Sequence, residues 1–297
     1  MRLVGRPRST LKLTGLLLGI IVIGVSCADE SSGTATDPQP IESEAQGQDG
    51  SERVHPDFNF TANEFDLVVS GFSSGLRANV LARPYEFLEG MSQVLDEPAH
   101  LTWLVDKTHY LPNDYRPEVL ADLDRYRNRL LLNRSGHQLS AEVVQPLFVM
   151  IDAASDADLS LLISSTFRSF DRQREVYDYR VEQLGQEEAD KVSARPGTSQ
   201  HQLGTTIDFG CICDEFAQEP IGIWLAEHAW EYGFSLSYPD GHYQQTGYTY
   251  EPWHFRFIGV PASRLEHEFF GGVQHELLEF LAEFREEFAS ARVEPGI

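Results

Sequence analysis

Two stretches decide the fold and the chemistry expected of this chain: Ser199-Gln-His-Gln-Leu-Gly-Thr-Thr-Ile-Asp208 and Glu251-Pro-Trp-His254. Together they supply two imidazoles and two carboxylates. Two His and one Asp suffice to hold a zinc ion with one coordination position open, and a free Glu beside them can act as a general base. The two stretches therefore predict a hydrolytic metal site.

Each of these residues also has an ordinary structural explanation. A His on a half-buried strand is usually a hydrogen-bonded core residue, and Asp208 could simply cap a helix or pair with an Arg. Arg168 could be a solvated cation, and the H-E-x-x-H pattern of many zinc proteases is absent. Their joint occurrence, with Gly204 allowing a tight turn between His201 and Asp208, favours a functional site.

Apolar spacing along the rest of the chain predicts an α+β fold in a single catalytic domain, with a small antiparallel or mixed sheet and helices around it. Residues 234–238 and 248–254 are expected to pair as antiparallel strands around a turn at 239–241, and Gly233 is expected to end the preceding helix. The expected helices are 64–80, 85–95, 141–154, 171–184, 221–232, 261–270 and 274–289, and the expected strands are 101–105, 159–165, 205–213, 234–238 and 248–254.

The first 27 residues are typical of a secretory signal, because a basic segment precedes the apolar run 13–25. Gly24-Val-Ser-Cys27 resembles a bacterial lipobox, so Cys27 is the expected lipidation site; an ordinary cleaved signal or an uncleaved anchor is the alternative. Residues 28–56 are acidic and almost free of apolar side chains, which predicts a flexible tether. We therefore expect a membrane-anchored lipoprotein in the periplasm or on the cell surface, with its catalytic domain at 57–297.

The composition excludes one broad class of function. The chain has 46 Asp and Glu against 23 Lys and Arg, a net charge of −23, and no basic patch, so nucleic-acid binding is not expected. A single residue separates Cys211 from Cys213, and a disulfide across so short a spacing is strained. We therefore expect two free thiols on one face of a strand, and the alternative is that they are soft metal ligands. We expect a monomer.

Further segments extend the pattern and resemble the VanY-type zinc D,D-carboxypeptidases, a family with close L,D-carboxypeptidase relatives. The resemblance is strongest over 101–259. It comprises Leu104-Val-Asp-Lys107, Leu111-Pro-Asn-Asp-Tyr-Arg-Pro117, Ser164-Ser-Thr-Phe-Arg-Ser169 with Gln173, Pro196-Gly-Thr-Ser-Gln-His-Gln-Leu-Gly204 with Asp208, Tyr232-Gly-Phe234, Tyr238-Pro239, Thr246-Gly-Tyr248 and Glu251-Pro-Trp-His254.

The resemblance implies a compact fold shared with the hedgehog N-terminal domain, and removal of terminal D-alanine from peptidoglycan stem peptides. It implies a zinc ion (Zn2+) held by His201, Asp208 and His254, with Glu251 as catalytic base. Arg168 would stabilise the developing oxyanion or anchor the peptide, and Gln173 and Ser199 would line the substrate cleft. The chain departs from the family at Thr166-Phe167, where Gly-Tyr is common, and at His242, where Lys is frequent.

Three alternatives stay open at this level. The enzyme could prefer the L,D bond of a tetrapeptide, or it could be an endopeptidase that cuts inside the stem. It could also be a non-catalytic zinc module that binds cell wall, which would need a fourth ligand such as Cys211, Cys213 or His242. Ser164-Ser-Thr-Phe167 has no Lys three residues after its first serine, so it does not form the S-x-x-K motif of a serine nucleophile.

Overall fold

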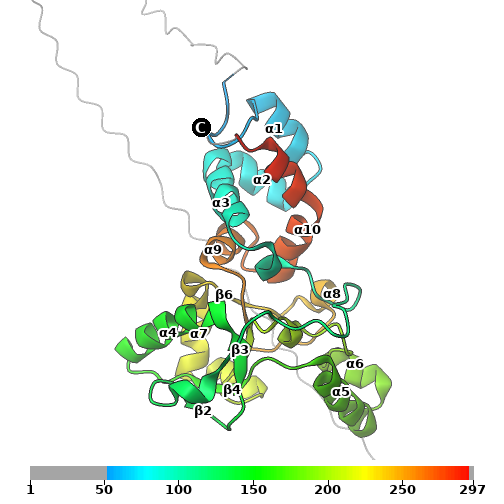
Figure 1. Cartoon of the computed structure of the whole chain (residues 1–297). Helices are drawn as coiled ribbons and strands as arrows, with labels where there is room; N and C mark the ends of the chain where they lie inside the picture. Colours follow the sequence, from blue (N-terminus) through cyan, green and yellow to red (C-terminus); the bar gives the residue numbers. More distant parts are fainter. Residues whose placement is uncertain (1–51, 294–297) are drawn as a thin grey trace, which may run out of the picture. The chain divides into compact units, whose positions relative to one another are not determined.

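The computed structural model describes residues 52–293 (Figure 1). A five-stranded sheet runs in the order β2-β4-β5-β7-β6, with β2 and β4 parallel and the other neighbouring strands antiparallel. A separate antiparallel pair joins β1 and β3. The strands are β1 Leu120–Asp122, β2 Leu131–Leu132, β3 Gln138–Ser140, β4 Leu162–Ser165, β5 Thr206–Phe209, β6 Phe234–Leu236 and β7 His254–Phe257.

Helices flank the sheet and, with the loops that connect them, make up most of the remaining described residues. The α-helices are α1 Ala62–Val69, α2 Ser74–Ala82, α3 Pro84–Asp96, α4 Ala141–Asp156, α5 Phe170–Leu184, α6 Gln186–Val192, α7 Pro220–His228, α8 Tyr243–Thr246, α9 Val260–Phe269 and α10 Gln274–Ala291. The 3-10 helices are η1 Ala99–Thr102, η2 Leu123–Tyr126, η3 Gln200–Leu203, η4 Asp214–Gln218 and η5 Ala229–Tyr232. The α+β class with a small mixed sheet is confirmed.

The two faces of the sheet have different chemistry. Side chains alternate along a strand, so Ile207 and Phe209 of β5 face one way and Asp208 the other. Ile207 and Phe209 belong to an apolar core that includes Leu147 of α4 and Leu225 of α7. The opposite face is also buried but polar, and this face carries the residues singled out by the sequence.

A second apolar core lies among α1, α2, α3, α9 and α10, which gather together in Figure 1. Phenylalanine dominates it: the ring of Phe87 meets those of Phe269, Phe280 and Phe288 edge-on at 5.2, 5.9 and 5.9 Å. Ile258, directly after β7, is fully buried in this core. The strand that starts with His254 therefore runs straight into the helical packing.

Six expected elements differ from the structure. The strand expected at 159–165 begins only at Leu162, and the helix expected at 221–232 consists of α7 followed by η5. The helix expected at 64–80 is broken into α1 and α2, because the Ser73 side chain accepts a hydrogen bond from the Leu76 amide and starts a new helix. The expected strand 101–105 is wrong: η1 lies there, and the carbonyls of Leu101 and Trp103 accept from Arg256 instead of a neighbouring strand.

The other two concern strand ends. The strand expected at 205–213 ends at Phe209, since Gly210 turns the chain with a φ of 60°. The strand expected at 248–254 begins only at His254, so β6 pairs with 255–257. Pro252 has no amide hydrogen for a ladder, which accounts for the late start. Gly233, with a φ of 87°, ends η5 as predicted.

The leader and most of the predicted tether lie outside the described residues. Residues 52–56, expected in the tether, already contact the folded part: Arg53 bridges to Thr61, and His55 is buried with its Nε2 3.0 Å from the Glu89 carboxylate. None of the helices found between residues 52 and 293 is long and apolar enough to cross a membrane.

Candidate metal centre

A tight turn brings His201 to the site. The 3-10 helix η3 ends at Gly204, whose φ of 72° lies in the left-handed region. A Cβ at this position would lie 2.6 Å from Cγ of Pro117, so both the conformation and the space require glycine. The turn leads directly into β5, which places Asp208 four residues further on.

The sheet register brings the other two predicted ligands together. Asp208 of β5 and His254 of β7 are directly opposed partners in the antiparallel ladder, so both side chains point to the same face. Ser165 of β4 pairs with Asp208 from the other side. The chain then continues to Arg168, whose backbone amide donates to the carbonyl of His201 at 3.1 Å. Three strands and one turn thus converge on one point.

The three predicted ligands lie close together and are buried. His201 Nε2 is 3.1 Å from Asp208 Oδ2, and His254 Nδ1 is 3.1 Å from Asp208 Oδ1. One ligand atom from each residue can be chosen so that all three lie within 4.8 Å of one another. The two imidazole rings meet edge-on with centroids 5.0 Å apart.

The donor set fits a divalent metal ion. Nδ1 of His201 bonds the carbonyl of Thr166 at 2.8 Å, which leaves Nε2 free to ligate and fixes the ring. Asp208 Oδ1 is buried and makes no well-aligned hydrogen bond, although Nδ1 of His254 lies 3.1 Å away, an arrangement that a cation would satisfy. Two imidazoles and one carboxylate are typical of catalytic zinc sites, in which a fourth position stays open.

The charges of the site depend on this burial. Burial lowers the pKa of His201 to about 4, helped by nearby Arg168, so its ring is neutral as a ligand must be. Burial alone would raise the pKa of Asp208, but the two imidazoles outweigh it and hold that pKa well below its usual range. Burial disfavours the cation on His254, yet the carboxylates of Asp208 and Glu251 raise its pKa to about 9. In the absence of metal these carboxylates thus favour a proton on His254, which a bound cation would replace.

Glu251 stands beside the three ligands. Its Oε2 lies 3.2 Å from Nδ1 of His254, and its backbone amide donates to the carbonyl of Tyr238 at 3.1 Å. Burial raises the pKa of the Glu251 carboxyl, while the neighbouring His254 opposes that rise. The carboxyl is thus placed and tuned to accept and return a proton.

Arg168 lies on the other side of Asp208. Its Nη1 donates to Oε1 of Gln173 at 2.7 Å and its Nη2 to Oγ of Ser165 at 3.1 Å, so two contacts fix the guanidinium. Its Nη2 also lies 4.0 Å from Asp208 Oδ2. Gln173 in turn donates to the carbonyl of Ala194 at 2.6 Å. The guanidinium is held as a fixed positive group at the edge of the site.

All the predicted site residues of the described range open into one cleft of about 630 Å³. Gln173 and Ser199 lie in the lining of this cleft, and their contact with substrate stays a prediction. Its lining includes Arg168, Gln173, Ser199, His201, Asp208, Tyr238, Tyr248, Glu251, Trp253 and His254. A cleft of this volume can enclose a ligand the size of a short peptide.

Two aromatic residues of the cleft have no role in the sequence-based prediction. The ring of Tyr238 packs on His254 with centroids 4.8 Å apart, and on Tyr248 at 4.7 Å. Lys107 Nζ lies 4.4 Å from the centre of the Tyr248 ring. Lys107, Tyr238 and Tyr248 all lie in the segments that carry the family resemblance, which was the available signal.

The expectation for the two neighbouring cysteines is wrong. Cys211 and Cys213 form a disulfide, with Cα atoms 5.4 Å apart. They lie in a loop beyond the end of β5 and not on a strand face, and this loop brings the Cα atoms to a distance that a disulfide spans. Within residues 52–293, neither these cysteines nor His242 joins the group of metal ligands, which consists of His201, Asp208 and His254.

The sequence-based prediction also missed a buried row of amides behind the site. Gln200, next to His201, donates to Oε1 of Gln274 at 3.0 Å and accepts from Oγ of Ser237 at 2.7 Å. Gln274 in turn donates to the carbonyl of Ser235 at 3.3 Å. All four residues are buried. Helix α10 therefore contacts the residue adjacent to a ligand.

Comparison with known proteins agrees with this geometry. The family model for VanY, D-alanyl-D-alanine carboxypeptidase, matches residues 136–260. The bifunctional D-Ala-D-Ala dipeptidase and D-Ala-D-Ala carboxypeptidase VanXYC of Enterococcus gallinarum is 30% identical over 173 residues, which cover 54% of this chain and 85% of that protein. The chain spans a smaller share, 65% and 47%, of the length of two other curated relatives, from Bacillus subtilis (strain 168) and Enterococcus faecium.

Two solved structures share the fold. The LD-carboxypeptidase LdcB superposes with a TM-score of 0.54 at 30% identity, over 59% of this chain and 84% of that one. A variant of the vancomycin-resistance D,D-pentapeptidase VanY, solved in complex with Zn(II), superposes with a TM-score of 0.51 at 26% identity, over 60% of this chain and 99% of that one. Both likenesses leave a substantial part of the present chain unmatched.

Proposed function

We propose that this chain, which belongs to the VanY family of D-alanyl-D-alanine carboxypeptidases, is a zinc-dependent enzyme that removes the C-terminal D-alanine from peptidoglycan stem peptides. One observation carries the proposal: a buried group of three metal-binding side chains shares a single cleft with the carboxyl of Glu251 and the guanidinium of Arg168. That combination supplies a metal, a base and a fixed positive charge within one peptide-sized space.

In the proposed mechanism, His201, Asp208 and His254 hold the metal. A bound zinc ion supplies Lewis-acid polarisation of the scissile carbonyl and lowers the pKa of a water molecule toward about 7. Glu251 accepts the proton of the attacking water and then gives it to the leaving amine. Its raised pKa suits both transfers, because a carboxyl that ionises nearer neutrality returns a proton more readily.

Arg168 has a separate task in this proposal. Its guanidinium is fixed by Gln173 and Ser165 and faces the cleft, so it meets a negative oxygen of the substrate without having to reorganise. That oxygen is either the carbonyl oxygen as it gains charge or the terminal carboxylate of the peptide, both of which make charge-assisted hydrogen bonds to Arg. A contact with the terminal carboxylate favours cleavage at the end of a chain. A contact with the carbonyl oxygen stabilises the transition state.

A second specificity is supported by one observation. LdcB is an LD-carboxypeptidase and shares 30% identity with this chain, so cleavage of the L,D bond of a tetrapeptide is the alternative within the same mechanism. An endopeptidase that cuts inside the stem is a weaker alternative. The difference depends on the shape of the cleft beside the cleaved residue.

The test is to incubate the purified protein with tetrapeptide and pentapeptide muropeptides and to identify the products by mass spectrometry, with and without a chelator. We expect release of D-alanine from the pentapeptide, loss of release with the chelator and recovery when zinc is added back. Release from the tetrapeptide alone would favour L,D specificity. Cleavage that persists without metal would contradict the mechanism, and zinc binding without any cleavage would favour a non-catalytic cell-wall module.

We further propose that the enzyme acts outside the cytoplasm, anchored to a membrane through lipid on Cys27. The basic segment, the apolar run 13–25 and the lipobox-like Gly24-Val-Ser-Cys27 support this, as does a substrate that lies outside the cytoplasm. Labelling with radioactive palmitate in a bacterial host tests it: the full chain should be labelled and Cys27→Ala should not. An unlabelled wild type would contradict the lipoprotein assignment. The expected monomer stays a prediction.

A further inference from the structure

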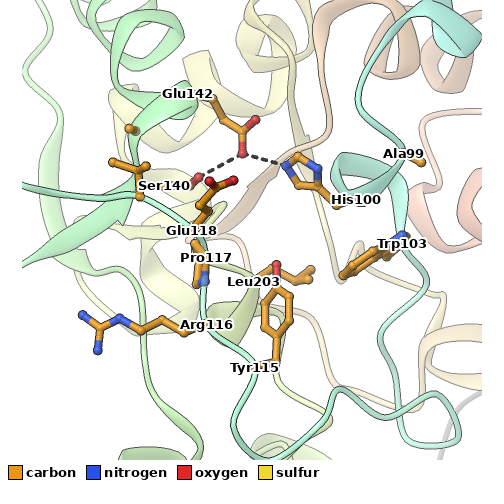
Figure 2. Close-up of a pocket in the computed structure, with 12 residues that line it drawn as sticks. Ala99, His100, Trp103, Tyr115, Arg116, Pro117, Glu118, Ser140, Glu142 and Leu203 are labelled. Atoms are coloured by element: carbon orange, nitrogen blue, oxygen red, sulfur yellow. Dashed lines mark hydrogen bonds and ion pairs between the residues drawn. The ribbon is translucent and has the colours of Figure 1, made fainter.

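A second cavity of about 670 Å³ lies beside η3 and has no part in the metal centre (Figure 2). Four segments line it: η1 with the residues that follow, the loop 115–119, the start of α4 and Leu203 of η3. We call it the side groove. Its lining residues are Ala99, His100, Trp103, Tyr115, Arg116, Pro117, Glu118, Val119, Ser140, Ala141, Glu142 and Leu203.

Two aromatic rings form one side of the side groove. The side chain of Trp103 is 44% exposed, although tryptophan is normally well buried. It meets Tyr115 edge-on with ring centroids 5.8 Å apart. The fully buried Arg256 donates to the carbonyls of Leu101 and Trp103 at 2.9 Å each, which fixes the backbone beneath the exposed indole. A rigid, exposed indole of this kind is a surface for packing a flat apolar face of a ligand.

Polar groups of both charges complete the groove. Oε1 of Glu142 accepts from Nε2 of His100 at 2.8 Å and from Oγ of Ser140 at 2.9 Å, and Figure 2 shows these groups opposite Tyr115. Glu118 and Arg116 are exposed on the loop beside them. Acceptors and donors are therefore both present, and neither sign of charge dominates. The chemistry suits a neutral, hydroxyl-rich ligand better than an anion or a cation.

We propose that the side groove binds the glycan of peptidoglycan, through N-acetylated sugar rings. A sugar ring has an apolar C–H face that packs on Trp103, while its hydroxyl and acetamide groups donate to and accept from groups such as Glu118, Glu142 and Arg116. Pockets that bind small molecules have volumes of roughly 300 to 1,000 Å³. The side groove lies within this range, and its volume suits a disaccharide. This inference rests on the proposed function, because the stem peptide is attached to such sugars.

The distance between the two sites is compatible with one substrate. Leu203 lines the side groove and His201 holds the metal, and two residues of chain span at most about 7 Å. An extended stem peptide of four or five residues spans roughly 13 to 18 Å. By length alone, a peptide with its end at the metal is long enough to reach the side groove, and the proposal is that the glycan bound there positions the stem for cleavage.

The first test is direct binding to the intact protein by isothermal titration calorimetry, which needs no catalysis. The probes are the peptide-free disaccharide of N-acetylglucosamine and N-acetylmuramic acid, chitotriose and, as a sugar without acetamides, cellotriose. We expect the two acetylated sugars to bind, and Trp103→Ala to weaken binding at least about tenfold, because it removes the main apolar contact. Glu118→Ala, an exposed loop substitution, should also weaken it. Tyr179→Ala is the matched control, since Tyr179 is 57% exposed and lies outside the groove.

Three outcomes would overturn the inference: no sugar binds at millimolar concentration, cellotriose binds as well as chitotriose, or both Trp103→Ala and Glu118→Ala bind as the wild type does. A second measurement compares kcat/KM on the free pentapeptide with kcat/KM on the disaccharide pentapeptide. The wild type should favour the disaccharide substrate through KM, and the ratio should fall in Trp103→Ala. An enzyme that releases D-alanine with no sugar preference and no sugar binding overturns only this inference, whereas sugar binding without any cleavage overturns only the proposed function.

Discussion

Glu251 is the residue at which metal binding and catalysis can be separated. Its carboxyl lies 3.2 Å from Nδ1 of His254 but is not one of the three grouped ligands. Glu251→Gln keeps the size of the side chain and removes its ability to accept a proton. We expect kcat to fall by about 10²- to 10⁴-fold, the usual contribution of a general base, while bound zinc stays at one ion per chain. Steady-state kinetics and metal analysis on the same preparation measure both quantities.

Asp208→Asn is the matched comparison, because it also neutralises one buried carboxylate of the cleft. This variant should lose zinc together with activity, since it removes the anionic ligand between the two imidazoles. The assignment of roles fails if Glu251→Gln loses its zinc, or if it keeps more than a tenth of wild-type kcat.

The residues that can be predicted from the sequence are those whose chemistry is specific to their type. Imidazoles and carboxylates ligate metals and move protons, so His201, Asp208, His254 and Glu251 attract notice wherever they lie. Gln274 does not, because an amide at the start of a helix has many ordinary explanations and its partner lies in another element. The disulfide between the two cysteines after β5 also escaped, since it depends on how the loop beyond the strand turns.

At the scale of elements, the turn between η3 and β5 is the most constrained feature near the site. Gly204→Ala forces a side chain into a left-handed conformation and into contact with Pro117. We expect the free energy of unfolding to fall by about 1 to 2 kcal/mol or more, together with a weaker affinity for zinc, because the turn positions His201. Chemical denaturation and zinc titration check the two effects.

Gly75→Ala is the matched control for this glycine. Gly75 lies in α2, has no left-handed φ, and a Cβ there would meet no atom within 4 Å. It should leave stability unchanged or raise it by roughly 0.4 to 1 kcal/mol, since alanine restricts the unfolded chain. Equal losses in the two variants would show that the effect at Gly204 is not specific to the turn.

Helix α10 provides a second prediction at this scale. Gln274→Ala leaves the buried amide of Gln200 without its acceptor, which should cost about 1 to 3 kcal/mol of unfolding free energy. Because Gln200 adjoins His201, we also expect zinc affinity to fall about 10-fold or more, as happens when groups that orient a ligand are removed. Zinc affinity measured by competition with a chromogenic chelator is the decisive readout.

Glu283→Ala, an exposed change on the same helix, is the control and should alter neither quantity. A merely structural role for Gln274 predicts loss of stability with unchanged zinc affinity at a temperature where the variant is folded, and that outcome would contradict the positioning role.

The elements themselves were predictable to different degrees. Helices with one apolar face, such as α4 and α5, follow from spacing alone, because their pattern depends on local contacts. The apolar residues of the segment 101–105 suit a strand as well as they suit a 3-10 helix. The conformation depends on Arg256, which is distant in sequence and donates to the carbonyls of this segment. Likewise the start of β7 depends on Pro252 and on pairing with β5, neither of which apolar spacing reveals. Long-range hydrogen bonds therefore account for most of the differences.

At the scale of the whole described range, stability depends on two apolar cores. One lies between the sheet and α4 with α7, and the other is the phenylalanine-rich helical core that includes α9 and α10. The family model covers 136–260 and so leaves most of the helical core unmatched. Glu266 of α9 is a buried acid whose raised pKa predicts that global stability depends on pH.

Burial raises the pKa of Glu266 to about 8, although Ser235 opposes the rise, and Oε2 of this carboxyl has no hydrogen-bond partner. In the unfolded chain the group ionises near its ordinary value of 4.5. Between these two pKa values the folded state binds more protons than the unfolded state, so the free energy of unfolding falls as pH rises. The contribution is complete below the unfolded pKa and is lost as pH rises through the folded one. The difference between the folded and unfolded pKa values of Glu266 corresponds to several kcal/mol of unfolding free energy, at about 1.4 kcal/mol per pKa unit.

Glu266→Gln replaces the buried acid with a neutral side chain of the same size. Urea unfolding between pH 4.5 and 9 should therefore show the variant gaining stability relative to the wild type as pH rises, by several kcal/mol at the upper end. Glu268→Gln on the same helix is the control, because its surface pair with Arg83 contributes little and should leave the pH profile unchanged. Parallel profiles for Glu266→Gln and the wild type would mean that the buried carboxyl is already ionised in the folded protein. Its charge would then need a stronger partner than the hydroxyl of Ser235 in β6, which lowers the pKa of Glu266 only in part.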